Sequence, residues 1–116
     1  MHEVWRYSGL FFLVNLCEAP IYCYFLRGTG FSALRRLAIV IALNVATHPV
    51  VFFLWPQWMR ALGATYWQMV MAAEAYAVGI EIFLIESLIP EFPIRKAVLA
   101  ALTANTCSLL FGMLLR

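Results

Sequence analysis

Charged side chains are scarce in this chain of 116 residues, of which only 12% are Asp, Glu, Lys or Arg and 65% are hydrophobic. A soluble domain carries roughly a quarter of charged residues, and half that fraction cannot cover an apolar core with solvated side chains. With a mean hydropathy of +0.86, the chain is predicted to fold in lipid. Its net charge of +2 is too small and too dispersed for a nucleic-acid-binding protein, so no nucleic-acid partner is expected.

Cysteine is also sparse, and its placement excludes two common frameworks. Cys17, Cys23 and Cys107 all lie in apolar runs. An odd number of cysteines without a CxxC pair argues against a disulfide scaffold and against a zinc ribbon. The first apolar run carries Asn15 and Glu18 in its middle, which is atypical of a cleaved signal peptide. We therefore interpret that run as a retained helix.

Long hydrophobic runs are what the chain has in place of charge. They cover residues 8–26, 37–55, 66–89 and 97–115. Three of them have 19 residues, close to the roughly 20 that cross a hydrocarbon core. The run 66–89 forms about 36 Å of helix and is long enough to tilt. Because the connections are short, we predict an all-α polytopic membrane protein: one transmembrane domain over residues 1–116, folded as an up-down bundle of four helices.

Lys and Arg are divided unevenly between the two sides of this bundle. The loops 27–36 and 90–96 hold five of the eight: Arg27, Arg35, Arg36, Arg95 and Lys96. The opposite side holds Arg6, Arg60 and Arg116. Because cytoplasmic loops carry the excess of Lys and Arg, these two loops are predicted to be cytoplasmic and both termini to lie on the other side.

Polar side chains fall near the middle of every run, where lipid accepts them poorly. They are Asn15, Glu18 and Tyr22 in the first run, Asn44, Thr47 and His48 in the second, Glu74 and Glu81 in the third, and Asn105 and Ser108 in the fourth. Spacings of three, four and seven residues put those of each run on one helix face. One charge at the bilayer centre costs about 2.5–3.5 kcal/mol, so the four polar faces are expected to meet inside the bundle.

Four titratable groups, Glu18, Glu74, Glu81 and His48, are the predicted proton- or cation-handling residues. Burial disfavours the charged form of a carboxyl group, so the cluster is expected to hold fewer than three negative charges at neutral pH. A carboxyl group is also a costly way to make one hydrogen bond inside lipid. Such groups therefore indicate a functional site.

The uncharged polar residues are predicted to support this cluster. They are Asn15, Asn44, Thr47, Asn105 and Ser108. Such residues also join helices simply by hydrogen bonding, at about 0.6 kcal/mol each, and that interpretation stays open for all five. Ala100, Ala104, Ser108 and Gly112 form a row of small residues, which favours close helix packing.

Metal binding and enzyme chemistry are weaker alternatives. If a metal is bound, its ligands would be Glu18, His48, Glu74 and Glu81, an oxygen-rich set that suits Mn or Fe. The chain has no HExxH, CxxC or paired Glu-x-x-His motif, and Glu74 and Glu81 lie about 10.5 Å apart along a helix. No cofactor is therefore predicted. Ser108 with His48 and a Glu supplies the residue types of a hydrolase, but no nucleophile motif surrounds them, and an enzyme is the least favoured interpretation.

Four short motifs resemble those of a group of small, uncharacterised bacterial membrane proteins. They are NxxE from Asn15, NxxTHP from Asn44, ExxxxxxE from Glu74 and NxxS from Asn105. The resemblance spans most of the chain. It implies a four-helix fold in the bacterial inner membrane and no particular activity.

A second likeness is to the small multidrug resistance family, four-helix proton antiporters that work as dimers. Glu18 stands where that family has a lone mid-membrane Glu, and Gly30-Phe31 is similar to its Gly-Phe after the first helix. His48 and the pair Glu74 and Glu81 have no counterpart there. The likeness is an analogy in size and chemistry.

Taken together, these patterns predict a small polytopic membrane protein for proton-coupled transport of a cation or small solute. Four helices of this length enclose little volume, so a homo-oligomer or a larger membrane complex is expected. The alternative is a non-catalytic accessory subunit, whose buried acids would pair with Arg or Lys of a partner protein.

Overall fold

Five α-helices account for nearly the whole chain in the computed structural model, which describes residues 2–114, with side chains from residue 5 onward. The elements are α1 (His2–Phe25), a 3₁₀ turn (Leu26–Thr29), α2 (Ala33–Pro49), a π-helical segment (Val50–Leu54), α3 (Trp55–Ala61), α4 (Tyr66–Leu88) and α5 (Ile94–Leu114). Four stretches are long and apolar enough to cross a membrane: Trp5–Thr29, Ala33–Ala61, Tyr66–Leu88 and Ile94–Leu114. The prediction of an all-α protein with four membrane-spanning helices is confirmed.

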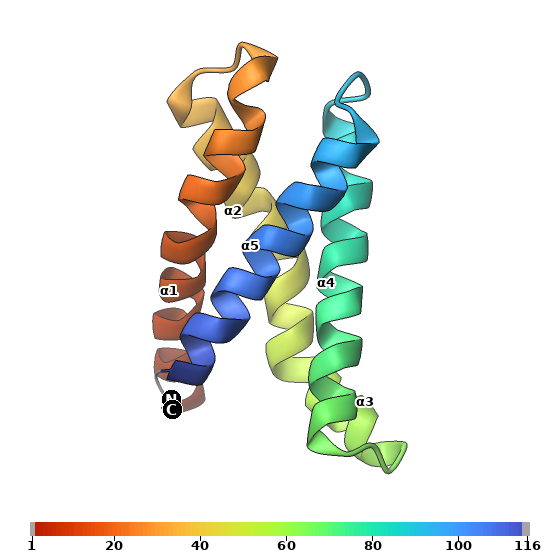
Figure 1. Cartoon of the computed structure of the whole chain (residues 1–116). Coiled ribbons are helices and arrows are strands. Elements are labelled where there is room, and N and C mark those ends of the chain that lie inside the picture. Colours follow the sequence, from red (N-terminus) through yellow and green to blue (C-terminus); the bar gives the residue numbers. More distant parts are fainter. Residues whose placement is uncertain (1, 115–116) are drawn as a thin grey trace.

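The helices form a closed ring in which each span has two neighbours. α1 packs against α2 and α5, and α4 packs against the same two helices, so α1 and α4 lie diagonally opposite. Figure 1 shows α5 crossing from the upper end of α4 to the lower end of α1. The loops 26–32 and 89–93 lie at one end, and both termini and the turn between α3 and α4 lie at the other. This is the predicted up-down bundle.

The second span differs most from its predicted extent of 37–55. It begins at Ala33, where the Ser32 hydroxyl caps the helix by accepting a hydrogen bond from the Arg35 N–H at 3.2 Å. It also continues past Pro56 to Ala61. The run predicted from the sequence stops at residue 55, directly before Pro56, but Pro56 stands in the first turn of α3, where a proline's missing N–H does little harm.

A π-helical segment makes this continuation possible. Pro49 lacks an N–H group and ends α2, and the following residues 50–54 adopt the wider π turn, in which the Trp55 N–H bonds to the Val50 carbonyl. π turns inside helices are often found at functional sites. Here the wider turn begins two residues after His48.

The other predicted bounds shift by a few residues at the helix ends. α1 already begins at His2 and α5 at Ile94, whereas the hydrophobic runs begin at residues 8 and 97. α4 ends at Leu88, one residue before the predicted end at 89. Positions 115 and 116, including Arg116, lie outside the described residues. Polar residues at helix ends continue a helix into the interface, and this is why a hydropathy run underestimates the helix length.

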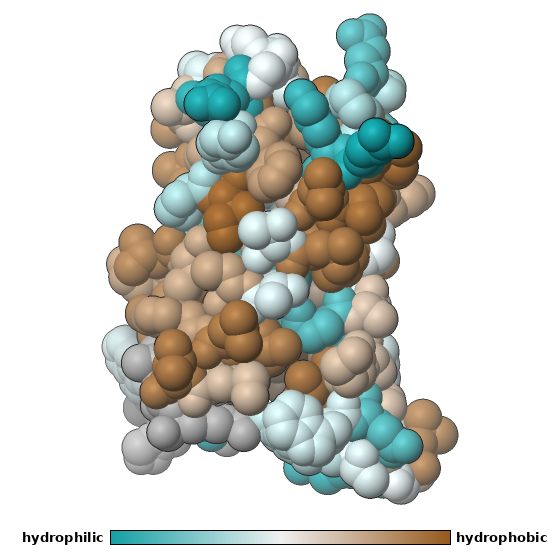
Figure 2. Space-filling model, viewed as in Figure 1, coloured by the Kyte–Doolittle hydropathy of each residue, from teal (hydrophilic) through white to brown (hydrophobic). Residues whose placement is uncertain are grey.

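Polarity in this bundle is reversed relative to a soluble protein. The buried polar residues are Glu18, Asn44, Thr47, Glu81 and Asn105. Large apolar side chains such as Phe12, Leu16 and Phe83 point outward and are more than half exposed. Figure 2 shows a mostly hydrophobic belt between two polar ends. The exposed surface of the spans therefore fits contact with lipid tails.

Small residues on α5 let it cross close to its neighbours. Ala97, Ala100, Ala101 and Ala104 are buried, and three of them belong to the core that Tyr22 shares. The predicted packing role of the small-residue row holds for Ala100 and Ala104. Gly112, at the far end of the row, is exposed.

We expect that Ala104→Leu destabilises the bundle, because Ala104 is fully buried and three added carbons have no room. Overpacking costs about 1–3 kcal/mol. Thr103→Leu is the matched control, since Thr103 lies next to it on the exposed face of α5. Thermal unfolding of both variants in detergent checks this. Equal unfolding temperatures for the two would contradict the packing described here.

Candidate functional site

A hydrogen bond runs directly across the bundle between the diagonal helices α1 and α4. The Tyr22 hydroxyl of α1 donates to Oε1 of Glu81 on α4. Both side chains are fully buried. Glu81 lies between Ala77 and Ile85 on the inner face of α4, where helical spacing brings it toward α1. The bond therefore holds a carboxyl group at the centre of the bundle.

Asn105 of α5 binds the same carboxyl group from a second side. Its Nδ2 donates to Oε1 of Glu81 at 3.1 Å and to the Ala101 carbonyl at 2.8 Å. Both amide hydrogens are thus used. One carboxylate oxygen of Glu81 receives two hydrogen bonds, whereas its Oε2 is buried without a partner.

The second fully buried carboxyl group, Glu18 of α1, is bound by α5 and faces α2. The Ser108 hydroxyl donates to Oε2 of Glu18 at 2.8 Å. Nε2 of His48 lies 3.8 Å from the same oxygen, within ion-pair range when the imidazole is protonated but too long for a hydrogen bond. Oε1 of Glu18 is buried and has no partner. Both acids therefore keep one unused oxygen.

Ser108 and Asn105 connect the two carboxyl groups along α5. The Ser108 hydroxyl also lies 3.1 Å from the Asn105 carbonyl, and its single hydrogen can serve only one acceptor at a time. These contacts join six polar residues into one group, which we call the central cluster: His48, Glu18, Ser108, Asn105, Glu81 and Tyr22. It draws on α1, α2, α4 and α5, so every span contributes.

Glu74 lies at the edge of the central cluster. It is half-buried, two turns before Glu81 on α4, and makes no hydrogen bond to the residues described. Its charge interacts with Glu18 and His48. The structure therefore brings together Glu18, His48 and Glu81 and leaves Glu74 within electrostatic reach of them.

No side chain of Lys or Arg in residues 5–114 is fully buried. The most buried of them is Arg36, which is half-buried and donates from Nη1 to the Cys23 carbonyl at 2.8 Å. Buried carboxylates without a paired cation are strongly destabilising. Protons, His48 in its charged form or a bound cation must therefore supply the compensation.

Asn15, Asn44 and Thr47 join helices without touching the carboxyl groups. Asn44 Nδ2 donates to Asn15 Oδ1 at 2.8 Å, and Asn15 Nδ2 donates to the Phe11 carbonyl at 2.9 Å. The Thr47 hydroxyl donates to the Leu43 carbonyl of its own helix at 3.1 Å. These contacts fit the packing interpretation. Asn105 and Ser108, in contrast, bind the acids directly.

Tyr22 was not among the predicted site residues. Its spacing of four residues from Glu18 put it on the polar face of its helix, and this was the available signal. Which acid it would bind depends on the diagonal placement of α1 and α4, which no local pattern contains.

The candidate metal ligands and the candidate hydrolase residues can each be compared with the geometry that their chemistry needs. Among the side chains described, no group of three or more His, Cys, Asp or Glu could hold one ion. A serine hydrolase needs the imidazole between the hydroxyl and the acid. Here Glu18 lies between Ser108 and His48, so the order is different.

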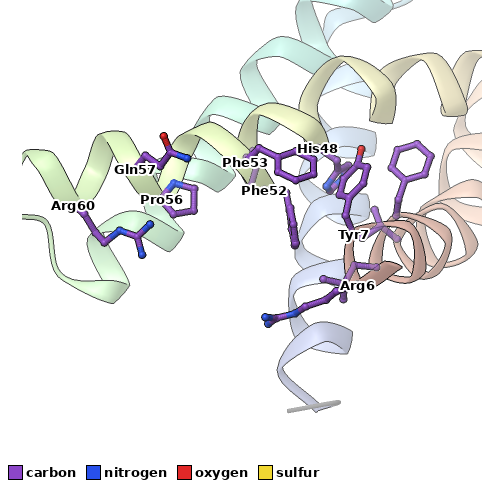
Figure 3. A pocket seen from close by; sticks show the side chains of 12 residues that line it. Arg6, Tyr7, His48, Phe52, Phe53, Pro56, Gln57 and Arg60 are labelled. Carbon is purple, nitrogen blue, oxygen red and sulfur yellow. The ribbon is translucent and has the colours of Figure 1, made fainter. Parts of the chain in front are cut away.

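His48 also lines an open pocket between α1 and the segment formed by the π turn and α3 (Figure 3). The pocket has a volume of about 760 Å³. It connects the surface of the bundle with the imidazole, which faces Glu18. His48 is thus the member of the central cluster that a solute in this pocket reaches first.

Comparison of the chain with models of protein families, with curated proteins and with solved structures finds no match.

We expect Tyr22→Phe to weaken the bundle, because it removes the donor to Glu81 while keeping the ring. Interhelical hydrogen bonds in membranes contribute about 0.6 kcal/mol on average and about 1.7 kcal/mol at most. Tyr24→Phe is the control, since Tyr24 is exposed and its contact with Arg27 involves only the ring. A double-mutant cycle of Tyr22→Phe with Glu81→Gln, measured by unfolding in detergent, should yield a coupling energy of this size. Strict additivity would argue against the bond.

Proposed function

We propose that this small polytopic membrane protein is a proton-coupled transporter whose central cluster exchanges protons for a cation or small solute. One observation supports this most strongly: Glu18 and Glu81 are both fully buried, and each keeps an oxygen without a partner. Asn44 also has a buried oxygen without a partner, but an unused acceptor costs more on a carboxyl group, which can be charged, than on a neutral amide. Unused acceptors on two buried acids are suited to gain and lose a proton or a cation.

The contacts suggest a direction for proton entry. A proton from the pocket would first reach His48, whose Nε2 faces Oε2 of Glu18. Transfer across that contact leaves a neutral imidazole and a neutral carboxylic acid, so two opposite charges disappear together. The Ser108 hydroxyl is then free to turn from Glu18 to the Asn105 carbonyl. Protonation of Glu18 would therefore loosen the contact between α1 and α5.

Glu81 would serve as a second proton-binding site. Asn105 already donates both of its amide hydrogens and has no proton to pass on. Direct transfer from Glu18 to Glu81 is therefore blocked in this arrangement. A movement of α5 that breaks the Ser108 contact would open the space between the two acids, and this fits alternation between two states.

The burial of Glu18 and Glu81 favours transport over the role of an accessory subunit. A partner's Arg or Lys cannot reach Glu18 or Glu81 from outside, because both acids are enclosed by the four spans. Among the three acids of the predicted site, only the half-buried Glu74 is open to such a partner.

The setting of the protein is part of the proposal. We place it in a bacterial inner membrane with loops 27–36 and 90–96 in the cytoplasm, because those loops hold most of the Lys and Arg. The bundle encloses little free space, and this supports a homo-oligomer or a larger membrane complex as the working form.

Glu18→Gln and Glu81→Gln should each abolish pH-driven flux in liposomes while leaving expression and folding intact. Glutamine keeps the shape and the acceptor oxygen but cannot exchange a proton. A pH-sensitive dye inside the vesicles, read after a cation gradient is imposed, measures the flux. Glu91→Gln is the control, because Glu91 is exposed in the loop 89–93. Full flux in either buried variant would refute the proposed role of that acid.

A further inference from the structure

The pocket beside His48 has a chemistry that proton exchange does not use. It is lined by Arg6, Tyr7 and Leu10 of α1, by Phe52 and Phe53 of the π-helical segment, and by Gln57 and Arg60 of α3, among others. Its volume of about 760 Å³ lies within the usual range for small-molecule sites. Polar groups and aromatic rings thus share one open cavity.

Two cationic side chains enter this pocket from different elements. Figure 3 shows Arg6 reaching from α1 toward α3, and Arg60 reaching from α3 toward α1. No described carboxylate pairs with either of them. Both side chains are exposed, and together they give the mouth of the pocket a positive charge. This charge favours an anionic ligand there.

A phosphate group matches these donors best. A guanidinium group donates two parallel hydrogen bonds to a phosphate, and it is weakly hydrated enough to do so at an interface. Gln57 and Tyr7 line the same cavity and add uncharged polar side chains, and Figure 3 shows the Tyr7 hydroxyl beside His48.

The remaining wall of the pocket is apolar and faces lipid. Leu10 and Phe53 are each 38% exposed, and the Tyr7 ring packs at a tilt against Phe52 and Phe53 with ring centroids 5.2 and 4.9 Å apart. A free phosphate has no use for such a wall. An acyl chain would cover it.

We propose that this pocket binds the headgroup of an anionic phospholipid, with the phosphate between Arg6 and Arg60 and an acyl chain along Phe52 and Phe53. The pocket lies at the end of the bundle that holds the chain termini and α3, so the lipid belongs to the leaflet at that end. His48 borders the inner end of the site. Binding itself does not require proton exchange, and only an effect of the lipid on His48 rests on the proposed function.

Tryptophan fluorescence provides a direct test. The four tryptophans, Trp5, Trp55, Trp58 and Trp67, all lie in the segments at this end of the bundle. The protein in detergent micelles is titrated with phosphatidylglycerol or phosphatidylcholine brominated on the acyl chains, which quench nearby indoles. Stronger quenching by phosphatidylglycerol is expected. Arg6→Gln and Arg60→Gln should each weaken that apparent affinity about tenfold, the size of one hydrogen bond to a charged group.

Arg35→Gln is the matched control, since Arg35 is equally exposed but lies at the opposite end and stacks on Phe31. It should leave the affinity unchanged. Equal quenching by the two lipids, or an unchanged affinity in the variant that lacks both Arg6 and Arg60, would overturn the proposal. Displacement of phosphatidylglycerol by inorganic phosphate at constant ionic strength would overturn it as well, because the site would then take a free anion.

Glu18→Gln separates this inference from the proposed function. It should retain the preference for phosphatidylglycerol while losing flux. A wild-type protein that binds phosphatidylglycerol but shows no pH-driven flux would contradict the transport proposal and support the lipid site.

Discussion

Lipid offers no hydrogen bonds to a polar side chain, and the architecture of this bundle follows from that constraint. Helices satisfy their own backbone groups, but the side chains of Glu18 and Glu81 need partners from other spans. Tyr22, Asn105 and Ser108 supply them, so the contacts that satisfy the acids also join α1, α4 and α5. The small residues of α5, such as Ala104, allow the short distances that these bonds require. The close packing of the helices and the hydrogen bonds of the central cluster therefore depend on each other.

The two buried carboxyl groups do not have all their hydrogen bonds, and the proposed function depends on these unused acceptors. Each buried carboxyl group keeps one oxygen without a partner, and no Lys or Arg among the described side chains is buried beside it. A cluster of this kind changes its contacts when it changes its charge. The π-helical segment after Pro49 widens the helix near His48, and its residues line an open pocket together with residues of α1. The His48 imidazole thus borders both the open pocket and the buried acids.

Much of this could be predicted from the sequence because hydropathy and helical spacing are local properties. Four apolar runs predicted the four spans, and the spacing from Asn15 to Glu18 and from Asn44 to His48 predicted polar inner faces. The hydrogen-bond partners of these side chains could not be predicted, because they depend on which helices lie diagonally opposite each other and on the relative depth of the helices. The bond from Tyr22 to Glu81 and the pocket shared by Arg6 and Arg60 are of this kind. The end of the second span was predicted too early for a related reason, because the π turn before Pro56 has no signature in the composition.

Infrared spectroscopy of the protein in lipid tests the central claim most directly, because the carbonyl stretch of a protonated carboxylic acid is separate from the bands of carboxylates and amides. The account predicts a carboxylic-acid band that appears or disappears as the pH is changed, that is slow to shift in heavy water and that loses intensity in Glu18→Gln or Glu81→Gln. It would be contradicted by a pH series without such a band, or by a band that both variants leave unchanged.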